Sequence, residues 1–337
     1  MKKIVNNPND FAREVIEGLA LAYPEYIRQL PGFQVILRRD APVAGKVTIL
    51  TGGGSGHEPM FAGYVGRGMA DASVAGNVFA SPPPPPIYEA AKAAHGGAGV
   101  LFLYGNYSGD VLNFDMAAEM LEQEDIAVRT VRVTDDVASA PPASLHERRG
   151  IAGDLFVIKV AGARAEEGAN LEEVATAAEK ANHCTRSMGV ALSSCVIPAS
   201  GRVIFELGEQ EMEIGMGIHG EPGVQRGQLQ PADQLVAEMV ARILVDLPMK
   251  AGDEVAVLVN GLGATPLGEL LIVFRGLARC LSKSGVKIWH SLVGNYVSSL
   301  DMAGFSISLM LLDADLKRWL AAQAETPAIV QTFDSRE

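Results

Sequence analysis

The sequence predicts an α/β protein with two α/β domains, whose mixed, largely parallel sheets are flanked by helices. Its 337 residues are enough for two domains that each bury a core of ordinary size. Short apolar runs typical of strands alternate with helical patterns, and this alternation is typical of a largely parallel sheet covered on both faces. Glycine-rich segments follow several of these runs, at the position where ligands bind in open α/β sheets.

The alternation is clearest in the first half of the chain. We expect strands at residues 34–37, 47–51, 99–104 and 127–133, and a helix at residues 114–123. Five consecutive prolines, residues 82–86, lack the backbone donors that a helix interior or a central strand needs. We expect them to form a stiff extended connector, with helical structure resuming at Ile87.

A helical pair at residues 155–164 and 171–186 leads into the second half of the chain. We place the domain boundary near residue 185, which gives an N-terminal domain of residues 1–185 and a C-terminal domain of residues 186–337. In the C-terminal domain we expect a helix at residues 267–282 and strands at residues 203–207, 211–218, 255–259, 286–292 and 305–312.

The composition excludes several classes of partner. The formal net charge is −12, with 40 acidic and 28 scattered basic residues, so nucleic acid and anionic lipid would be repelled. The three cysteines lie in apolar surroundings, which is typical of free thiols in a reducing compartment. No apolar span reaches the ~18 residues needed to cross a bilayer, and no signal peptide is apparent. We therefore expect a cytoplasmic protein that binds neither nucleic acid nor a membrane.

Residues 52–59, GGGSGHEP, follow the expected strand at residues 47–51. No Lys-Ser/Thr pair follows the glycines, and Pro59 stands where the helix of a dinucleotide-binding motif would begin. The segment is therefore neither of the common phosphate-binding loops. Its glycines allow close backbone approach to a small polar ligand, so we predict a binding loop that carries His57; a plain tight turn is the alternative.

A second histidine has a similar setting, because His219 in residues 218–222, IHGEP, is also bracketed by glycine and Glu-Pro. The repetition suggests that two imidazoles meet at one site. Histidine can act as a general acid or base, or as a covalent nucleophile when neutral. The alternative is that each imidazole only caps its own loop by bonding to backbone.

Asp110 is the natural third member of this site, because it ends residues 105–110, GNYSGD, after another expected strand. It could accept a proton from a substrate hydroxyl, or instead cap a helix that begins at Val111. These three residues could also hold zinc, as in a metal-dependent hydrolase, but no HExxH or cysteine-rich spacing supports a metal. Residues 261–266, GLGATP, could bind phosphate, although Pro266 favours a structural helix start.

Together these motifs resemble the substrate-binding subunits of dihydroxyacetone kinases. The resemblance covers nearly the whole chain and is carried by DAPVAGKV at 40–47, GGGSGHEP at 52–59, GNYSGD at 105–110, MGIHGEPG at 216–223, NGLGATPLGEL at 260–270 and SLDMAGFSISL at 299–309. It implies a homodimer of two-domain α/β subunits, in which a histidine of the HGEPG loop forms a hemiaminal with the ketone carbon of the substrate.

The resemblance also implies roles for single residues. His219 would be the covalent anchor, His57 would hydrogen-bond the substrate and help to deprotonate it, and Asp110 would accept the hydroxyl proton. Gly54, Ser55 and Gly56 would line the pocket. A neutral imidazole attacks a carbonyl, which glycerol lacks, so covalent capture would separate ketoses from polyols by reaction rather than by shape.

The chain departs from the family pattern next to Asp110. Some members contact substrate through a lysine where this chain has Gly105, and Ser108 replaces a threonine. Gly105 leaves room, so a four-carbon ketose such as erythrulose is an alternative substrate to dihydroxyacetone. A non-catalytic ketose sensor or coactivator is a further alternative, although retention of His57 and Asp110 favours an enzyme.

The resemblance places the nucleotide on another protein. Single-chain members that use ATP carry a further helical nucleotide-binding domain, and we expect no such domain within these 337 residues. We expect this chain to bind no cofactor itself and to be inactive alone. A separate kinase subunit would hold ATP or ADP with Mg²⁺, and the phosphoryl group would come from ATP or from a phosphotransferase-system relay fed by phosphoenolpyruvate.

Overall fold

The computed structural model describes residues 2–332 and divides them into two compact units. The N-terminal unit contains Lys2–Val133, Leu155–Ala181 and the described residues from Asp315 onward. The C-terminal unit contains Thr134–Asp154 and Asn182–Ala314. The sequence predicts a boundary near residue 185, and the chain passes from one unit to the other at residues 181–182; it also crosses at residues 133–134, 154–155 and 314–315.

The sheet of the N-terminal unit has the strand order β1-β2-β4-β3-β5-β6. Its strands are β1 (Ile27–Gln29), β2 (Val35–Arg38), β3 (Thr48–Ser55), β4 (Ala72–Val78), β5 (Val100–Gly105) and β6 (Val128–Val133). The neighbours β4, β3, β5 and β6 are parallel, and β2 runs antiparallel to both β1 and β4. A separate antiparallel pair is formed by β13 (Ala324–Glu325) and β14 (Val330–Gln331).

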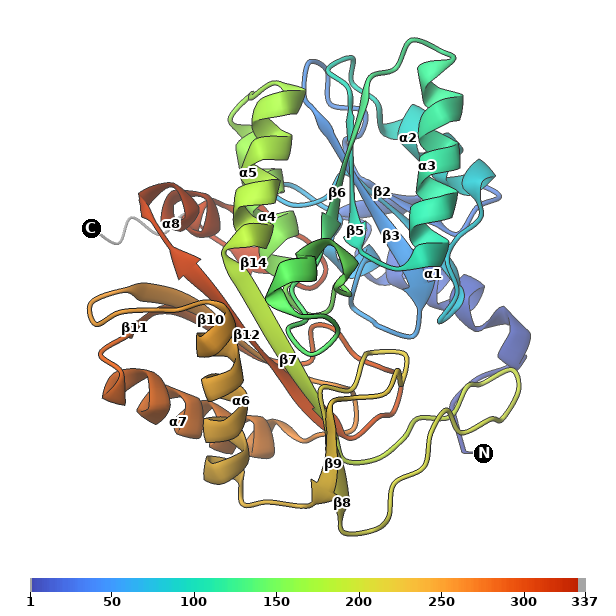
Figure 1. Ribbon diagram of the computed structural model, residues 1–337. Coiled ribbons are helices and arrows are strands. Elements are labelled where there is room, and N and C mark those ends of the chain that lie inside the picture. Colours follow the sequence, from blue (N-terminus) through green and yellow to red (C-terminus); the bar gives the residue numbers. More distant parts are fainter. Residues whose placement is uncertain (1, 333–337) are drawn as a thin grey trace. The chain divides into compact units, whose positions relative to one another are not determined.

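Helices cover both faces of this sheet (Figure 1). They are α1 (Phe11–Ala22), α2 (Pro84–Ala94), α3 (Ser108–Glu122), α4 (Asp154–Glu166), α5 (Leu171–His183) and α8 (Ala314–Ala321). Apolar side chains of α2 and α3, such as Ile87 and Phe114, form one core with Leu50 of β3 and Phe102 of β5. β5 is buried along its whole length and almost continuously apolar, as expected for a strand in a sheet covered on both sides.

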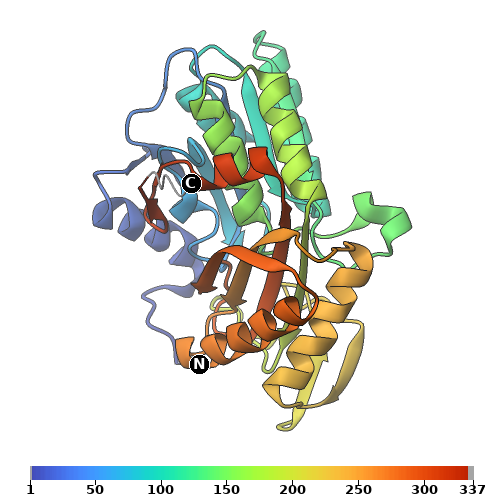
Figure 2. The same ribbon diagram turned by 90° about the vertical axis from the view of Figure 1, so that its left-hand side faces the viewer.

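The C-terminal unit has a sheet of order β11-β10-β12-β7-β8-β9. Its strands are β7 (Thr185–Ala191), β8 (Glu211–Ile214), β9 (Gln225–Gln228), β10 (Glu254–Gly261), β11 (Lys287–Gly294) and β12 (Gly304–Leu312). Two helices, α6 (Ala232–Asp246) and α7 (Leu267–Lys283), lie side by side against it (Figure 2). Within residues 2–332, no helix is long and apolar enough to span a bilayer.

The predicted α/β class is confirmed, but the two sheets differ in strand direction. Parallel pairing dominates the N-terminal sheet. In the C-terminal sheet β10 and β11 are parallel, whereas β12 is antiparallel to β10 and β7, and β8 is antiparallel to β7 and β9. The connections at residues 215–224 and 295–303 are too short for the helical crossover that a parallel arrangement requires.

Some predicted elements were wrong in whole or in part, among them the end of the helix predicted at 171–186, where α5 ends at His183 and β7 begins at Thr185. The proline run 82–86 is not a connector throughout, because α2 begins at Pro84; proline is tolerated in the first helical turn, where its missing N–H would have no helical partner. The predicted strand at residues 203–207 is absent, and this stretch contributes only an isolated bridge between Val203 and Val196. The strand predicted at 211–218 ends at Ile214, because Gly215 has a φ of +83°.

Candidate functional site

The glycines before His57 belong to β3 itself, rather than to a loop after it. A Cβ on Gly53 would lie 2.7 Å from the Phe61 ring, and one on Gly54 would lie 2.7 Å from the Ala80 nitrogen. The end of β3 can therefore approach its neighbours more closely than side chains would permit. The turn proper begins at Gly56, whose φ is +101°.

His57 is buried at 2 % exposure and stacks on the ring of Phe79, with the ring centroids 5.0 Å apart. Phe79 is held in place by its backbone nitrogen, which donates to the Ser55 carbonyl at 2.9 Å. It has a φ of +56°, a conformation that is uncommon for a bulky residue and is concentrated at functional sites. No local sequence pattern indicates this contact, because Phe79 lies 22 positions after His57.

Glu58 shapes the turn around His57. One of its carboxylate oxygens accepts a hydrogen bond from the Gly56 nitrogen at 3.0 Å. Burial raises the pKa of Glu58, and backbone hydrogen bonds oppose that increase. This carboxylate therefore holds the backbone on one side of His57, while Phe79 holds its ring.

Asp110 lies in the first turn of α3 and is 8 % exposed. The alternative in which it caps a helix starting at Val111 was wrong, because α3 begins at Ser108 with Tyr107 at the N-cap position. The start of α3 is tied to the segment after Phe79, since the Asn113 amide nitrogen donates to Ser81 Oγ at 3.1 Å. One segment, residues 79–82, thus contacts both the His57 ring and the helix that carries Asp110.

The remaining predicted residues of this unit gather at the same edge of the sheet. Gly105 is the last residue of β5, which runs parallel to β3, so the carboxyl ends of both strands share that edge. Ser55 Oγ donates a hydrogen bond to the Gly76 carbonyl at 2.7 Å, so its proton is used within the protein. Gly54, Ser55, Gly56, His57, Gly105 and Asp110 therefore form one cluster, in which Ser55 has a structural bond.

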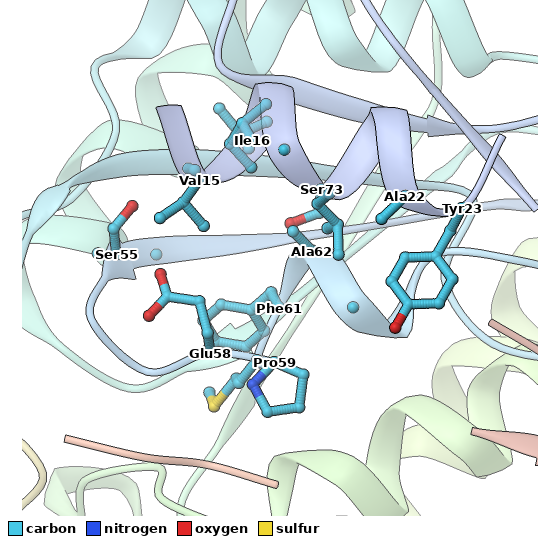
Figure 3. A pocket seen from close by; sticks show the side chains of 18 residues that line it. Val15, Ile16, Ala22, Tyr23, Ser55, Glu58, Pro59, Phe61, Ala62 and Ser73 are labelled. Carbon is cyan, nitrogen blue, oxygen red and sulfur yellow. The ribbon is translucent and has the colours of Figure 1, made fainter. Parts of the chain in front are cut away.

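A cavity of about 460 Å³ adjoins the end of β3 (Figure 3). Its walls come from α1 and from residues 58–63, and Gly53, Gly54 and Ser55 also line it. Figure 3 shows the Glu58 carboxylate on the Ser55 side and Tyr23 at the opposite end. Neither His57 nor Asp110 lines this mostly apolar space, although Gly54 and Ser55 of the predicted cluster do.

His219 belongs to the C-terminal unit, in the segment between β8 and β9. Its ring Nδ1 lies 3.0 Å from Glu221 Oε1, and its backbone nitrogen donates to Glu221 Oε2 at 3.0 Å. The imidazole is 22 % exposed. Burial would raise the pKa of Glu221, but the hydrogen bond from His219, the charge of that ring when it is protonated, and the charge of Arg149 outweigh it and lower that pKa to about 2. Glu221 is therefore a carboxylate at neutral pH.

Two further hydrogen bonds fix the His219 segment. The Gly223 nitrogen donates to Glu213 Oε1 at 2.7 Å, and Ser299 Oγ donates to the Ile218 carbonyl at 2.5 Å. Gly220 has a φ of +81°, which suits glycine at this turn. The motifs at residues 216–223 and 299–309 therefore meet in the structure.

Arg149 connects this segment to a distant part of the sequence. Its guanidinium bonds the Asp136 carboxylate at 2.8 Å and the Gly215 carbonyl at 3.1 Å, and it lies 3.9 Å from Glu221 Oε2. Burial raises the pKa of Asp136 to about 6, although the charge of Arg149 opposes the increase. No sequence signal near His219 identifies Arg149, because the two positions are brought together only by the fold.

The GLGATP segment makes structural contacts. Thr265 Oγ1 donates to the Gly304 carbonyl at 2.6 Å and accepts from the Gly304 nitrogen at 2.8 Å. Asn260, just before the segment, accepts hydrogen bonds from the backbone nitrogens of Tyr296 and Val297. The Asn260 bonds join the end of β10 to the segment after β11, and the Thr265 bonds join the GLGATP segment to the start of β12. No group of three or more His, Cys, Asp or Glu side chains in residues 2–332 is arranged to hold a metal ion.

The structure thus brings His57, Asp110 and Gly105 to one edge of the N-terminal sheet, and it pairs His219 with Glu221 in the C-terminal unit. That His219 meets His57 and Asp110 at a single site stays a prediction. Phe79, Glu221 and Arg149 are additional residues of these clusters. Of these three, only Glu221 could have been identified from the local sequence, because it stands two positions after His219 in the same turn.

Known proteins resemble this chain along nearly its whole length. It is 47% identical over 328 residues to the dihydroxyacetone-binding subunit of PTS-dependent dihydroxyacetone kinase 2 from Listeria innocua, covering 97% of this chain and 98% of the relative. It is 44% identical to D-erythrulose kinase from Mycolicibacterium smegmatis, covering 97% of this chain but only 56% of that longer protein.

A solved structure shares the fold. The dihydroxyacetone kinase of C. freundii superposes with a TM-score of 0.90 at 35% identity, and the match covers 100% of this chain and 61% of that one. The Dak1 domain matches residues 17–328. With this match over most of its length, and with relatives of this similarity, the chain belongs to the Dak1 domain family.

Proposed function

We propose that this chain is the ketose-binding subunit of a dihydroxyacetone kinase, a phosphotransferase that acts only together with a partner subunit. It holds dihydroxyacetone as a hemiaminal on His219 while a separate nucleotide-bearing subunit supplies the phosphoryl group. The observation that carries the proposal is the fixed pairing of His219 Nδ1 with Glu221, in a chain that matches a dihydroxyacetone-binding subunit from end to end.

The proposed chemistry uses each unit for a different task. In the C-terminal unit His219 Nε2 adds to the ketone carbon, which captures ketoses and rejects polyols that lack a carbonyl. In the N-terminal unit His57 hydrogen-bonds the captured substrate and Asp110 accepts the proton of its terminal hydroxyl. Gly54, Gly56 and Gly105 give the substrate close access to the backbone. Covalent capture supplies the positioning that phosphoryl transfer chiefly needs.

The partner is proposed from the same relatives. A nucleotide-binding kinase subunit would hold ATP or ADP with Mg²⁺, and this chain would bind no cofactor of its own. The similarity to a PTS-dependent enzyme favours a phosphoryl group relayed from phosphoenolpyruvate over direct use of ATP. A homodimer of this chain is part of the proposal.

A four-carbon ketose is the second candidate substrate. Two observations favour it: position 105 is glycine, which leaves room beside the proposed ketose, and a 44% identical relative is a D-erythrulose kinase. The same hemiaminal chemistry applies, because erythrulose also carries a ketone.

Intact-protein mass spectrometry tests the capture step. The protein is incubated with dihydroxyacetone, with erythrulose and with glycerol under gentle conditions, beside His219→Ala. We expect an adduct of one ketose on the wild type, none with glycerol, and none on the variant. Absence of any ketose adduct on the wild type would contradict the proposal.

Reconstitution tests the kinase role. The chain is combined with the nucleotide-binding subunit of a related dihydroxyacetone kinase and with either ATP or a phosphoenolpyruvate-fed relay, and ketose phosphate is measured. We expect product only when both subunits are present. An adduct without turnover in every combination would instead favour a ketose sensor that controls another protein.

A further inference from the structure

The His219 ring has two nitrogens, and their roles are fixed by what Nδ1 bonds. A carboxylate can only accept a hydrogen bond, so its 3.0 Å contact with Nδ1 requires the proton to be on that nitrogen. The lone pair of the neutral ring is then on Nε2. An imidazole in water prefers to carry the proton on Nε2, so the paired carboxylate selects the less common tautomer.

We infer that Glu221 is a positioning residue for capture of the carbonyl: it selects the Nδ1–H tautomer of His219 and neutralises the charge that the ring acquires during the addition. This inference rests on the proposed function, since it concerns how the same histidine reacts. The tautomer itself, however, is a property of the unliganded protein and can be measured without any ketose.

In the addition step a bond forms between Nε2 and the ketone carbon, while the π electron pair of the carbonyl moves to oxygen. That oxygen then takes a proton from water, which leaves hydroxide in the solvent. The ring becomes a cation whose Nδ1–H faces the Glu221 carboxylate. A charge-assisted hydrogen bond of this kind is stronger than a neutral one, so the adduct gains more from Glu221 than the free ketose complex does.

The surroundings of Glu221 favour this role over a purely surface contact. Its second oxygen, Oε2, accepts the His219 backbone nitrogen and lies 3.9 Å from the Arg149 guanidinium. Gly217 packs against this group so closely that a Cβ there would overlap Glu221 Oε2 and lie 2.7 Å from Arg149 Nη1. The carboxylate is thus held at a fixed angle to the ring.

Glu213 provides a matched control within the same segment. Like Glu221, it accepts a hydrogen bond from a backbone nitrogen of the turn, that of Gly223, and it pairs with an arginine, Arg226. Its two oxygens bond the Gly223 nitrogen and Arg226, whereas those of Glu221 bond the His219 backbone nitrogen and ring. If Glu221 only tethered the backbone, replacing either glutamate by glutamine would have similar effects on the His219 tautomer and on the rate of adduct formation.

The test uses ¹⁵N-labelled histidine in the full-length chain, which contains six histidines. The ring resonances of His219 are identified by their loss in His219→Ala, and the two nitrogen shifts report the tautomer. We expect Nδ1–H in the wild type and in Glu213→Gln, and a shift towards Nε2–H in Glu221→Gln. In the same proteins we expect the rate of ketose adduct formation to fall about 10- to 100-fold for Glu221→Gln, as for carboxylates that orient ligating histidines.

The outcomes separate the two proposals. A wild type that forms no ketose adduct contradicts the proposed function, whereas the tautomer measurement still decides the role of Glu221. The inference is overturned if Glu221→Gln keeps the Nδ1–H tautomer and the wild-type adduct rate. It is also overturned if both glutamine variants slow the reaction equally without a change of tautomer, since this result would mean that Glu221 only tethers the backbone.

Discussion

At the scale of single residues, the turns that contain His57 and His219 share one hydrogen-bonding pattern. In each, a glutamate that precedes proline folds back onto the turn: Glu58 accepts from the Gly56 nitrogen, and Glu221 accepts from the His219 nitrogen. The turns differ in the ring contact, because Glu221 also bonds the imidazole, whereas His57 stacks on Phe79. The two imidazoles therefore have different surroundings, a carboxylate beside His219 and an aromatic ring beside His57.

The close packing at Gly217 leads to a prediction. Replacing Gly217 by alanine adds a Cβ that would overlap Glu221 Oε2, so the carboxylate must move away from the His219 ring. We expect slower ketose adduct formation than in the wild type, measured by mass spectrometry over time. Gly227→Ala is the control, because a Cβ there meets nothing within 4 Å. Equal rates in all three proteins would contradict this account.

The proposed roles of His219 and Asp110 separate capture from transfer. His219→Ala should abolish the adduct, whereas Asp110→Asn should retain it and slow phosphoryl transfer by on the order of 10²-fold or more, because the general base is lost. Adduct mass and reconstituted turnover are measured for both variants. Loss of the adduct in Asp110→Asn as well would assign Asp110 a structural role at the start of α3.

At the scale of elements, the end of β3 shows why a strand can contain consecutive glycines. Residues 52–54 look like a loop in the sequence, yet the structure continues β3 through Ser55. Their small size is required by Phe61 on one side and by Ala80 on the other. Local sequence could not distinguish these cases, because both a turn and a close backbone approach select glycine.

Helix α1 contains a glycine at a position where a larger side chain would fit. Gly18 lies in the helix interior and lines the cavity beside β3, and an added Cβ would meet nothing within 4 Å. Gly18→Ala should therefore raise the free energy of unfolding by about 0.5–1 kcal/mol, since alanine loses less backbone freedom on folding. Chemical denaturation measures the change.

Gly68→Ala is the contrasting variant in the same unit. Gly68 has a φ of +77°, and its added Cβ would overlap the Gln323 carbonyl oxygen. We expect this variant to be destabilised. Stabilisation of both variants, or of neither, would show that the local surroundings of the two glycines do not determine the effect.

The elements that the sequence predicts well are the long or strongly apolar ones. The strands β5, β10 and β12 and the helix α7 lie where the patterns place them. The central strand β4 had no such signal, because its sequence, ASVAGNV, mixes small and polar residues. Its place between β3 and β2 supplies the burial that its own composition does not indicate.

At the scale of the whole molecule, each unit contains one of the two tryptophans, Trp289 in the C-terminal unit and Trp319 in the N-terminal unit. Trp319 lies near a buried lysine: Lys159 of α4 is 3 % exposed, and its Nζ donates to the Trp319 carbonyl at 2.8 Å. Burial lowers the pKa of Lys159 to about 7. The fluorescence of Trp319 can therefore report the stability of the unit that contains this lysine.

The low pKa of Lys159 makes stability depend on pH. Between about pH 7 and the usual lysine pKa of 10.5, the unfolded chain binds more protons at this position than the folded chain. The free energy of unfolding of the wild type should therefore rise with pH across this window, relative to Lys159→Met, by at most about 1.4 kcal/mol per pH unit. Denaturation at several pH values in a Trp289→Phe background measures both profiles. Parallel profiles would contradict the lowered pKa.

The sequence by itself determined the α/β class, most of the strands, the family resemblance and the two glycine-framed histidines. These follow from local patterns, because periodicity, glycine and proline act through the backbone of their immediate neighbours. Only the tertiary structure decided that residues 134–154 join residues 182–314, that Phe79 stacks on His57, and that Arg149 lies beside Glu221. Such contacts join residues far apart in the chain, and they depend on how whole elements pack rather than on any short segment.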